Sequence, residues 1–347
     1  MIYPLKFVPV FQERIWGGKN LYQTLGRPVP GELRTHSVGE SWEFADLAPG
    51  SVQSDSRGAN PDGSLSSRLA NGPWTGRTIG QVLHECAAQL VGRMRLGTGG
   101  HVPLLVKFLD ARADLSIQVH PDETYCRNHP GTHVKSEAWY VLDAEPGARI
   151  FKGLKPGVNQ EALRRAVEQG QVESVLNSVS VRAGDFHYLP SGTVHALGAG
   201  MLVAEVQTPS DTTFRLFDWH RLGPGGKPRA LHIEAALEAI DYAAPSPDAA
   251  VRVQQICPQG GSADTLVKCA HFEISRIHWS GGVQTLESGR AGVWIIVSGQ
   301  GLIQARGIGP TAFTRGDVVF LPAGLEDARV CAVSDCVRLE VKLPEAV

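Results

Sequence analysis

Long apolar runs, paired cysteines and a surplus of basic residues are all missing from this sequence of 347 residues. No apolar run approaches the ~20 residues that a membrane-spanning helix needs, so we expect no membrane partner. The opening segment, MIYPLKFVPVFQERIWGG, is too polar and too interrupted by proline to serve as a signal peptide. The six cysteines form no Cys-x-x-Cys pair, which favours reduced thiols and a cytoplasmic protein.

The numbers of basic and acidic residues in the chain are nearly equal. Lys and Arg together number 33 and Asp and Glu number 35, which gives a net charge of −2. Nucleic-acid binders usually carry a clustered basic surplus, so we expect no nucleic-acid partner.

Glycine and proline, by contrast, are abundant, with 39 and 22 residues. This composition is typical of many short strands joined by tight turns and predicts a mainly β fold. Helical spacing of apolar residues predicts two helices, over residues 78–91 and 159–176. Segments rich in β-branched and aromatic residues predict strands at 115–120, 138–142, 186–189, 201–207, 293–297 and 318–321.

An internal repeat organises the chain. Residues 184–197 read GDFHYLPSGTVHAL, and residues 316–329 read GDVVFLPAGLEDAR. Each copy has a matching upstream strand, EAWYVL from 137 and GVWIIV from 292. Such units are typical of small β-barrels of the jelly-roll type. We therefore expect a catalytic barrel with helical insertions over 1–245, a linker over 246–264, and a metal-free barrel over 265–347 that buries one face of the first.

The two copies of the repeat differ at positions that carry chemistry. His195 in the first copy corresponds to Asp327 in the second, and Glu137 corresponds to Gly292. Only the first copy therefore offers an imidazole and a carboxylate at these positions, and we expect a metal site in the first barrel alone.

Gln118 and His120 complete the candidate metal site. They are two residues apart on a predicted strand, so their side chains share one face. Together with Glu137 and His195 they offer two imidazoles, a carboxylate and an amide oxygen. Such donors suit zinc, and iron, manganese or cobalt are also possible.

Several segments resemble type I mannose-6-phosphate isomerases of the cupin superfamily, especially the shorter bacterial form. They are PLLVKFLDA (103–111), LSIQVHPDE (115–123), KSEAWYVLDAEPGA (135–148), GDFHYLPSGTVHALG (184–198) and EVQTPSDTTFRLFDWHR (205–221). The resemblance implies a sugar-phosphate substrate, one zinc ion per chain, and a monomer or weak homodimer.

The same resemblance implies roles for individual residues. The zinc ligands are Gln118, His120, Glu137 and His195. The catalytic residues are Arg215, Glu205 and Lys107. The substrate-binding residues are Ser116, Glu40 and Arg221.

Interconversion of an aldose and a ketose moves a proton between C1 and C2 through a cis-enediol, which requires a base and a group that stabilises negative oxygens. Glu205 has the best claim as base, although it could instead be a strand carboxylate paired with Arg215. If residues 207 and 212 closed a simple hairpin, Glu205 would face away from Arg215. An odd loop, a bulge or strands in different sheets would remove this conflict.

Two other functions remain open for the sequence. One is a cupin oxygenase that uses iron at the same ligands. The other is a non-catalytic sugar-binding cupin in which the metal only stabilises the barrel. Arg215, Lys107 and Glu205 beside a full ligand set favour the isomerase.

Overall fold

The computed structural model describes residues 2–52, 56–223, 226–243, 253–257 and 261–346, and it consists of four β-sheets with short helices. Sheet 1 contains, in spatial order, β10 (Phe186–Leu189), β7 (Glu137–Ala144), β12 (Met201–Gln207), β5 (Leu105–Ala111), β2 (Val10–Gly18), β3 (Val38–Leu47) and β4 (Leu65–Ser66). Sheet 2 contains β13 (Phe214–Phe217), β6 (Ile117–Val119), β11 (His195–Leu197), β8 (Arg149–Leu154) and β9 (Leu176–Ser180).

The C-terminal part of the chain builds the other two sheets. Sheet 3 contains β1 (Leu5–Lys6), β21 (Val318–Leu321), β18 (Gly292–Ser298), β23 (Cys336–Lys342), β16 (Glu273–Trp279), β15 (Gly261–Lys268) and β14 (Val253–Cys257). Sheet 4 contains β17 (Gly282–Thr285), β22 (Arg329–Ala332), β19 (Gln300–Gln304) and β20 (Thr311–Thr314). The predicted mainly β fold is confirmed. Among the described strands no sheet closes on itself, so each predicted barrel is an open two-layered sandwich.

The helices are α1 (Asn20–Gln23), α2 (Ile79–Val91), α3 (Glu123–Asn128), α4 (Gln160–Glu168) and α5 (Ile233–Ala239). The helix predicted from Thr78 is confirmed, and Thr78 and Gln81 form a reciprocal capping box at its start. The helix predicted over 159–176 is only partly correct. It ends at Glu168 because Gly170 adopts φ 66°, a left-handed conformation that terminates helices, and Leu176 already begins β9. No helix in the described ranges is long and apolar enough to cross a membrane.

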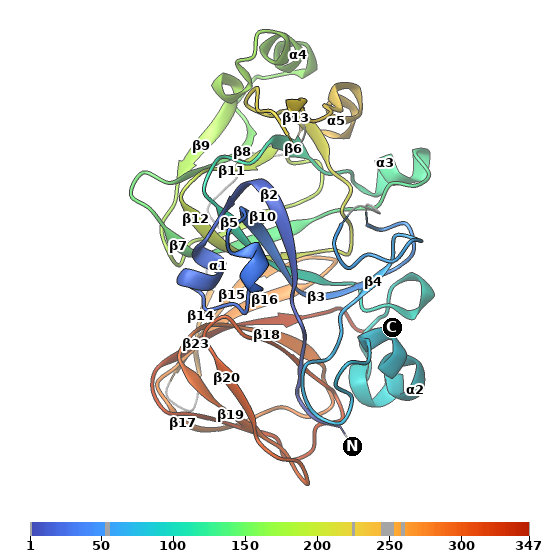
Figure 1. Cartoon of the computed structure of the whole chain (residues 1–347), viewed down its shortest axis with the longest axis vertical. Helices are drawn as coiled ribbons and strands as arrows, with labels where there is room; N and C mark the ends of the chain where they lie inside the picture. Colours follow the sequence, from blue (N-terminus) through green and yellow to red (C-terminus); the bar gives the residue numbers. More distant parts are fainter. Residues whose placement is uncertain (1, 53–55, 224–225, 244–252, 258–260, 347) are drawn as a thin grey trace.

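Alternation along the strands explains how the layers stack (Figure 1). On β6, Ile117 and Val119 face outward and join a buried cluster with Leu163 of α4 and Leu237 of α5. Gln118, between them, faces the space between sheets 1 and 2 and lines a cavity there. Helices α4 and α5 thus cover the outer face of sheet 2, at the top of Figure 1.

Sheet 3 packs on the outer face of sheet 1. Their facing side chains form one continuous buried cluster, in which the rings of Phe44 and Phe320 stack with centroids 5.9 Å apart. The second unit therefore buries one face of the first, as the sequence predicts. The predicted linker, however, carries β14 and the start of β15, and its remaining residues lie outside the described ones. In addition β1, near the N-terminus, pairs with β21 in sheet 3. The domain boundaries themselves stay a prediction.

The sequence repeat has a structural counterpart. Glu137 pairs with Leu189 where β7 meets β10, and Gly292 pairs with Leu321 where β18 meets β21. The two units thus place Glu137 and Gly292 at equivalent points of equivalent strands.

Candidate metal centre and active site

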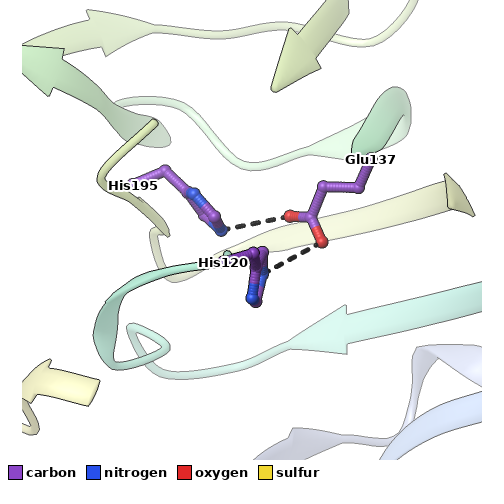
Figure 2. Close-up of side chains that lie close together, drawn as sticks. All are labelled: His120, Glu137 and His195. Atoms are coloured by element: carbon purple, nitrogen blue, oxygen red, sulfur yellow. Dashed lines mark ion pairs between the residues drawn. The ribbon is translucent and has the colours of Figure 1, made fainter. Parts of the chain in front are cut away.

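Three predicted ligands converge in the space between sheets 1 and 2 (Figure 2). His120 directly follows β6, His195 begins β11 and Glu137 begins β7. The Nε2 atoms of His120 and His195 lie 3.3 and 3.1 Å from the two carboxylate oxygens of Glu137. All three side chains are at least 98% buried.

Hydrogen bonds on the far side of each imidazole fix which nitrogen faces the carboxylate. The Nδ1 of His120 lies 2.9 Å from the Thr212 carbonyl oxygen, and that of His195 lies 2.8 Å from the Thr193 carbonyl oxygen. Because a carbonyl only accepts, each Nδ1 must donate, and neutral rings then present Nε2 as an acceptor. Burial, followed by the charge of Lys135, lowers the pKa of His120 to about 3, so this ring is neutral.

Two acceptor nitrogens therefore face the Glu137 carboxylate, whose charged partner in the described chain is the Lys135 ammonium 3.0 Å away, and neither imidazole Nε2 has a hydrogen-bond donor among the described residues. Acceptors at such distances repel one another unless a cation lies between them. A hydrogen bond from the far nitrogen of the ring to a backbone carbonyl, as both histidines have, is also typical of histidines that bind a metal. The arrangement fits a divalent metal with imidazole and carboxylate ligands.

Gln118 lies beside this triad on the same face of sheet 2. It is the register partner of His195 on β11 and of Arg215 on β13, so these three residues form one row across three strands. Its Oε1 accepts a hydrogen bond of 3.1 Å from the Ser116 hydroxyl. The structure thus places the predicted amide ligand next to the triad.

A cavity of about 590 Å³, lined by Gln118, opens beside the candidate metal centre. Most of the predicted site residues line it, namely Glu40, Lys107, Ser116, Gln118, Glu205 and Arg215. These residues come from both sheets, so the predicted set is largely brought together by the fold.

The sheet 1 wall of the cavity holds a network of buried charges. The Oε1 of Glu205 accepts a 3.0 Å hydrogen bond from Trp139 Nε1, and its Oε2 lies 3.6 Å from the Lys107 ammonium. Lys107 lies 3.9 Å from Glu40 and over the ring of Trp42. Burial and then the charge of Glu137 raise the pKa of Glu205, despite the neighbouring lysines. A raised pKa makes this carboxylate a better proton acceptor.

A simple hairpin would make Glu205 face away from Arg215, but the two residues lie on strands of different sheets. Glu205 lies on β12 in sheet 1, whereas Arg215 lies on β13 in sheet 2, and both line the cavity. The alternative that Arg215 is paired with Glu205 finds no support. Within the described residues, Arg215 forms no ion pair, and its buried Nε has no hydrogen-bond partner.

Arg221 is the predicted substrate ligand that the fold does not bring to the cavity. Its Nη2 lies 2.5 Å from the Asp218 carboxylate, and a second nitrogen donates to the Asp114 carbonyl. Arg229, which also bonds Asp218, lines the cavity in its place.

Lys135 is the functional candidate that the sequence analysis missed. Its ammonium lies 3.0 Å from Glu137, and the residue is only 4% exposed. Burial alone would lower its pKa, but the carboxylates of Glu137, Glu205 and Asp211 raise it above the ordinary value. Its position two residues before Glu137, and hence on the same face of an extended segment, was the available signal.

Comparisons with known proteins give a consistent result. A family model described as phosphomannose isomerase type I, catalytic domain, matches residues 4–148. Mannose-6-phosphate isomerase ManA of Bacillus subtilis is 35% identical over 336 residues, covering 96% of this chain and 98% of that protein. A mannose-6-phosphate isomerase of Streptococcus mutans is 33% identical and covers 93% of each chain. The crystal structure of the mannose 6-phosphate isomerase from Bacillus subtilis superposes with a TM-score of 0.83 at 30% identity, covering 99% of this chain and 100% of that one.

Proposed function

This chain belongs to the type I phosphomannose isomerase family, and from that premise we propose that it interconverts mannose 6-phosphate and fructose 6-phosphate with one bound zinc ion. The observation that carries the proposal is the buried convergence of His120, Glu137 and His195 beside a cavity with opposed acidic and basic groups. We assign Gln118 as a fourth ligand because it shares a sheet face with His195. The free thiols of the five cysteines with described side chains fit our expectation of a cytoplasmic protein.

The electrostatics of the cavity suit a sugar phosphate. Six basic side chains line it, against four carboxylates. The surplus of two positive charges matches a phosphate dianion, and the mixture of donors and acceptors suits the sugar hydroxyls. Ser116, Arg215 and Arg229 lie on the sheet 2 side of the cavity and are our candidates for contacts with the substrate oxygens.

We assign Glu205 as the group that moves the proton between C2 and C1. Trp139 fixes one of its oxygens by a hydrogen bond, and the other faces Lys107. The carboxylate would accept the C2 proton of the aldose and return it to C1, so that it ends the cycle unchanged. Lys107 holds the carboxylate in place and offsets its charge before the proton arrives.

Arg215 and Lys135 stabilise the developing enediolate. Both are positively charged side chains that line the cavity, and Arg215 forms no ion pair within the described residues that would neutralise its charge. Zinc, when bound by the four ligands, supplies Lewis-acid stabilisation of the same negative charge.

Proton exchange at C2 tests the proposed function. We expect the zinc-loaded protein in heavy water to incorporate deuterium at C2 of mannose 6-phosphate and to form fructose 6-phosphate in a coupled assay. Binding without exchange would overturn the proposal in favour of a sugar-binding protein. Oxygen consumption with an iron-loaded site, in the absence of isomerisation, would overturn it in favour of an oxygenase.

A further inference from the structure

Four arginines line the cavity between sheets 1 and 2, and they differ in how firmly the protein holds them. Arg14 contacts Glu40 through Nε and Nη2, and Arg229 contacts Asp218 through the same two nitrogens. The two carboxylate side chains are at most 11% exposed. Because a buried carboxylate left without its partner is costly, Arg14 and Arg229 are committed to the walls of the cavity.

Arg57, on the loop between β3 and β4, is held less firmly. Its Nη2 contacts Oε1 of Glu13, and this is the only hydrogen bond of its guanidinium group to the described residues. The side chains of Arg57 and Glu13 are 52% and 36% exposed. Exposed ion pairs contribute little stability, so another anion can take the place of Glu13.

The backbone of Arg57, by contrast, is fixed to the wall of the cavity. Gln12 on β2 is only 2% exposed, and its side chain bonds both backbone groups of Arg57. Its Nε2 donates to the Arg57 carbonyl oxygen at 2.9 Å, and its Oε1 accepts from the Arg57 N–H at 3.0 Å. The guanidinium group can therefore turn from Glu13 toward the cavity about a fixed point.

Glu13 keeps a second partner when Arg57 turns away. Its Oε2 lies 2.7 Å from Nδ1 of His36, and this hydrogen bond lowers the pKa of Glu13. The carboxylate is therefore ionised at neutral pH and competes with other anions for Arg57.

The reacting end of the substrate determines where its phosphate lies. In the proposed reaction C1 and C2 lie at the metal centre and Glu205, where both cavity lysines are also paired, Lys107 with Glu205 and Lys135 with Glu137. Arg215 is next to the same centre, in register with a proposed ligand. The C6 phosphate is at the opposite end of the six-carbon chain. Arg57 is the cavity cation that it can recruit.

We propose, on the basis of the proposed function, that Arg57 binds the C6 phosphate of the substrate and gives up Glu13 to do so. The planar guanidinium group matches two phosphate oxygens. Because the C6 phosphate does not react, this contact is the same in the ground state and in the transition state. Arg57 thus sets the affinity for phosphorylated substrates, and Glu13 opposes it.

Calorimetry of the zinc-loaded full chain with a hexitol 6-phosphate tests this without turnover, since a hexitol has no carbonyl group and cannot isomerise. We expect Arg57→Ala to raise Kd about tenfold or more, and Arg57→Lys to raise it less. Arg68→Ala removes the same charge at an exposed position outside the cavity and should leave Kd unchanged. In the coupled assay, Arg57→Ala should raise KM for mannose 6-phosphate in parallel while kcat stays within about twofold.

Glu13→Gln distinguishes the exchange from a general effect of charge. It should lower Kd by about threefold in the wild-type background, and most of this gain should disappear in the Arg57→Ala background. An unchanged Kd in Arg57→Ala, or an equal gain from Glu13→Gln in both backgrounds, would overturn this inference while isomerisation leaves the proposed function standing. Failure of the folded wild type to bind the hexitol 6-phosphate would contradict both.

Discussion

Gln118 lies directly opposite Arg215 where β6 pairs with β13, so the guanidinium and the proposed amide ligand share one face of sheet 2. This relationship places a permanent positive charge next to the proposed metal without a carboxylate partner in the described chain. It also separates two possible roles of Arg215, because a group that braces the fold needs an internal partner and a group that binds substrate does not.

We predict that Arg215→Ala and Arg215→Lys both fold and both retain zinc, but lose turnover by about a hundredfold or more. Lysine should not rescue the activity because an ammonium cannot reproduce a planar, two-pronged contact. Melting temperature, zinc content and kcat measured on the same preparations check this. Near-normal turnover per folded Arg215→Ala molecule would make Arg215 part of the scaffold.

The metal should reside in the first unit alone. Gly292 and Asp327 replace Glu137 and His195 in the second unit, and Gly292 has no side chain to offer. Elemental analysis should give close to one zinc per chain, and Glu137→Ala or His195→Ala should abolish tight binding. Two equivalent metals per chain would contradict this account of the repeat.

Lys135 should compete with the metal for Glu137. Its ammonium lies 3.0 Å from that carboxylate, and removing one partner of a buried ion pair is costly. We predict that Lys135→Met destabilises the metal-free protein by about 3 kcal/mol, that zinc recovers most of this loss, and that turnover falls sharply. Thermal melts with and without zinc, with Lys155→Met at an exposed position as the control, provide the measurement. A similar loss of stability in both metal states would mean that Lys135 serves the fold rather than the site.

Glu40 should contribute stability that depends on pH. Burial alone would raise its pKa, but the charges of Arg14 and Lys107 hold it at about 2, below the unfolded value of 4.5. Since the folded pKa is the lower one, the contribution is complete above about pH 4.5 and is lost as pH falls toward 2. In metal-free protein, Glu40→Gln should cost about 3 kcal/mol at neutral pH and less than half of that at about pH 3.

Denaturant unfolding across that range tests the prediction, with Glu32→Gln at an exposed position as the matched control. A cost that stays constant between neutral pH and pH 3 would show that the charge of Glu40 contributes nothing to it.

Strand alternation and the repeat were sufficient to predict much of the site. The spacing of Gln118 and His120 and the contrast of Glu137 with Gly292 can be read from the sequence, and the structure brings the side chains of His120, Glu137 and His195 together, with Gln118 in register beside His195. Their role as metal ligands stays a prediction. Local patterns could not predict that β12 and β13 lie in different sheets, since this depends on long-range packing. Local patterns also could not predict that Arg221 binds Asp218 and so does not line the cavity.

The end of one helix was predicted less well for a similar reason. Apolar spacing continued past Gly170, but the left-handed conformation of that glycine ended the helix. The predicted linker is rich in turn-forming residues, yet β14 and β15 pair there because the edge of sheet 3 is available to them.

A zinc titration of turnover tests the central claim most directly. Metal-free protein, verified by elemental analysis, would receive zinc in steps while fructose 6-phosphate formation from mannose 6-phosphate is followed in a coupled assay. We predict no turnover without metal, a linear rise with added zinc, and a plateau at one zinc per chain. Full activity in the metal-free protein, or no fructose 6-phosphate from folded, zinc-loaded protein, would contradict the account.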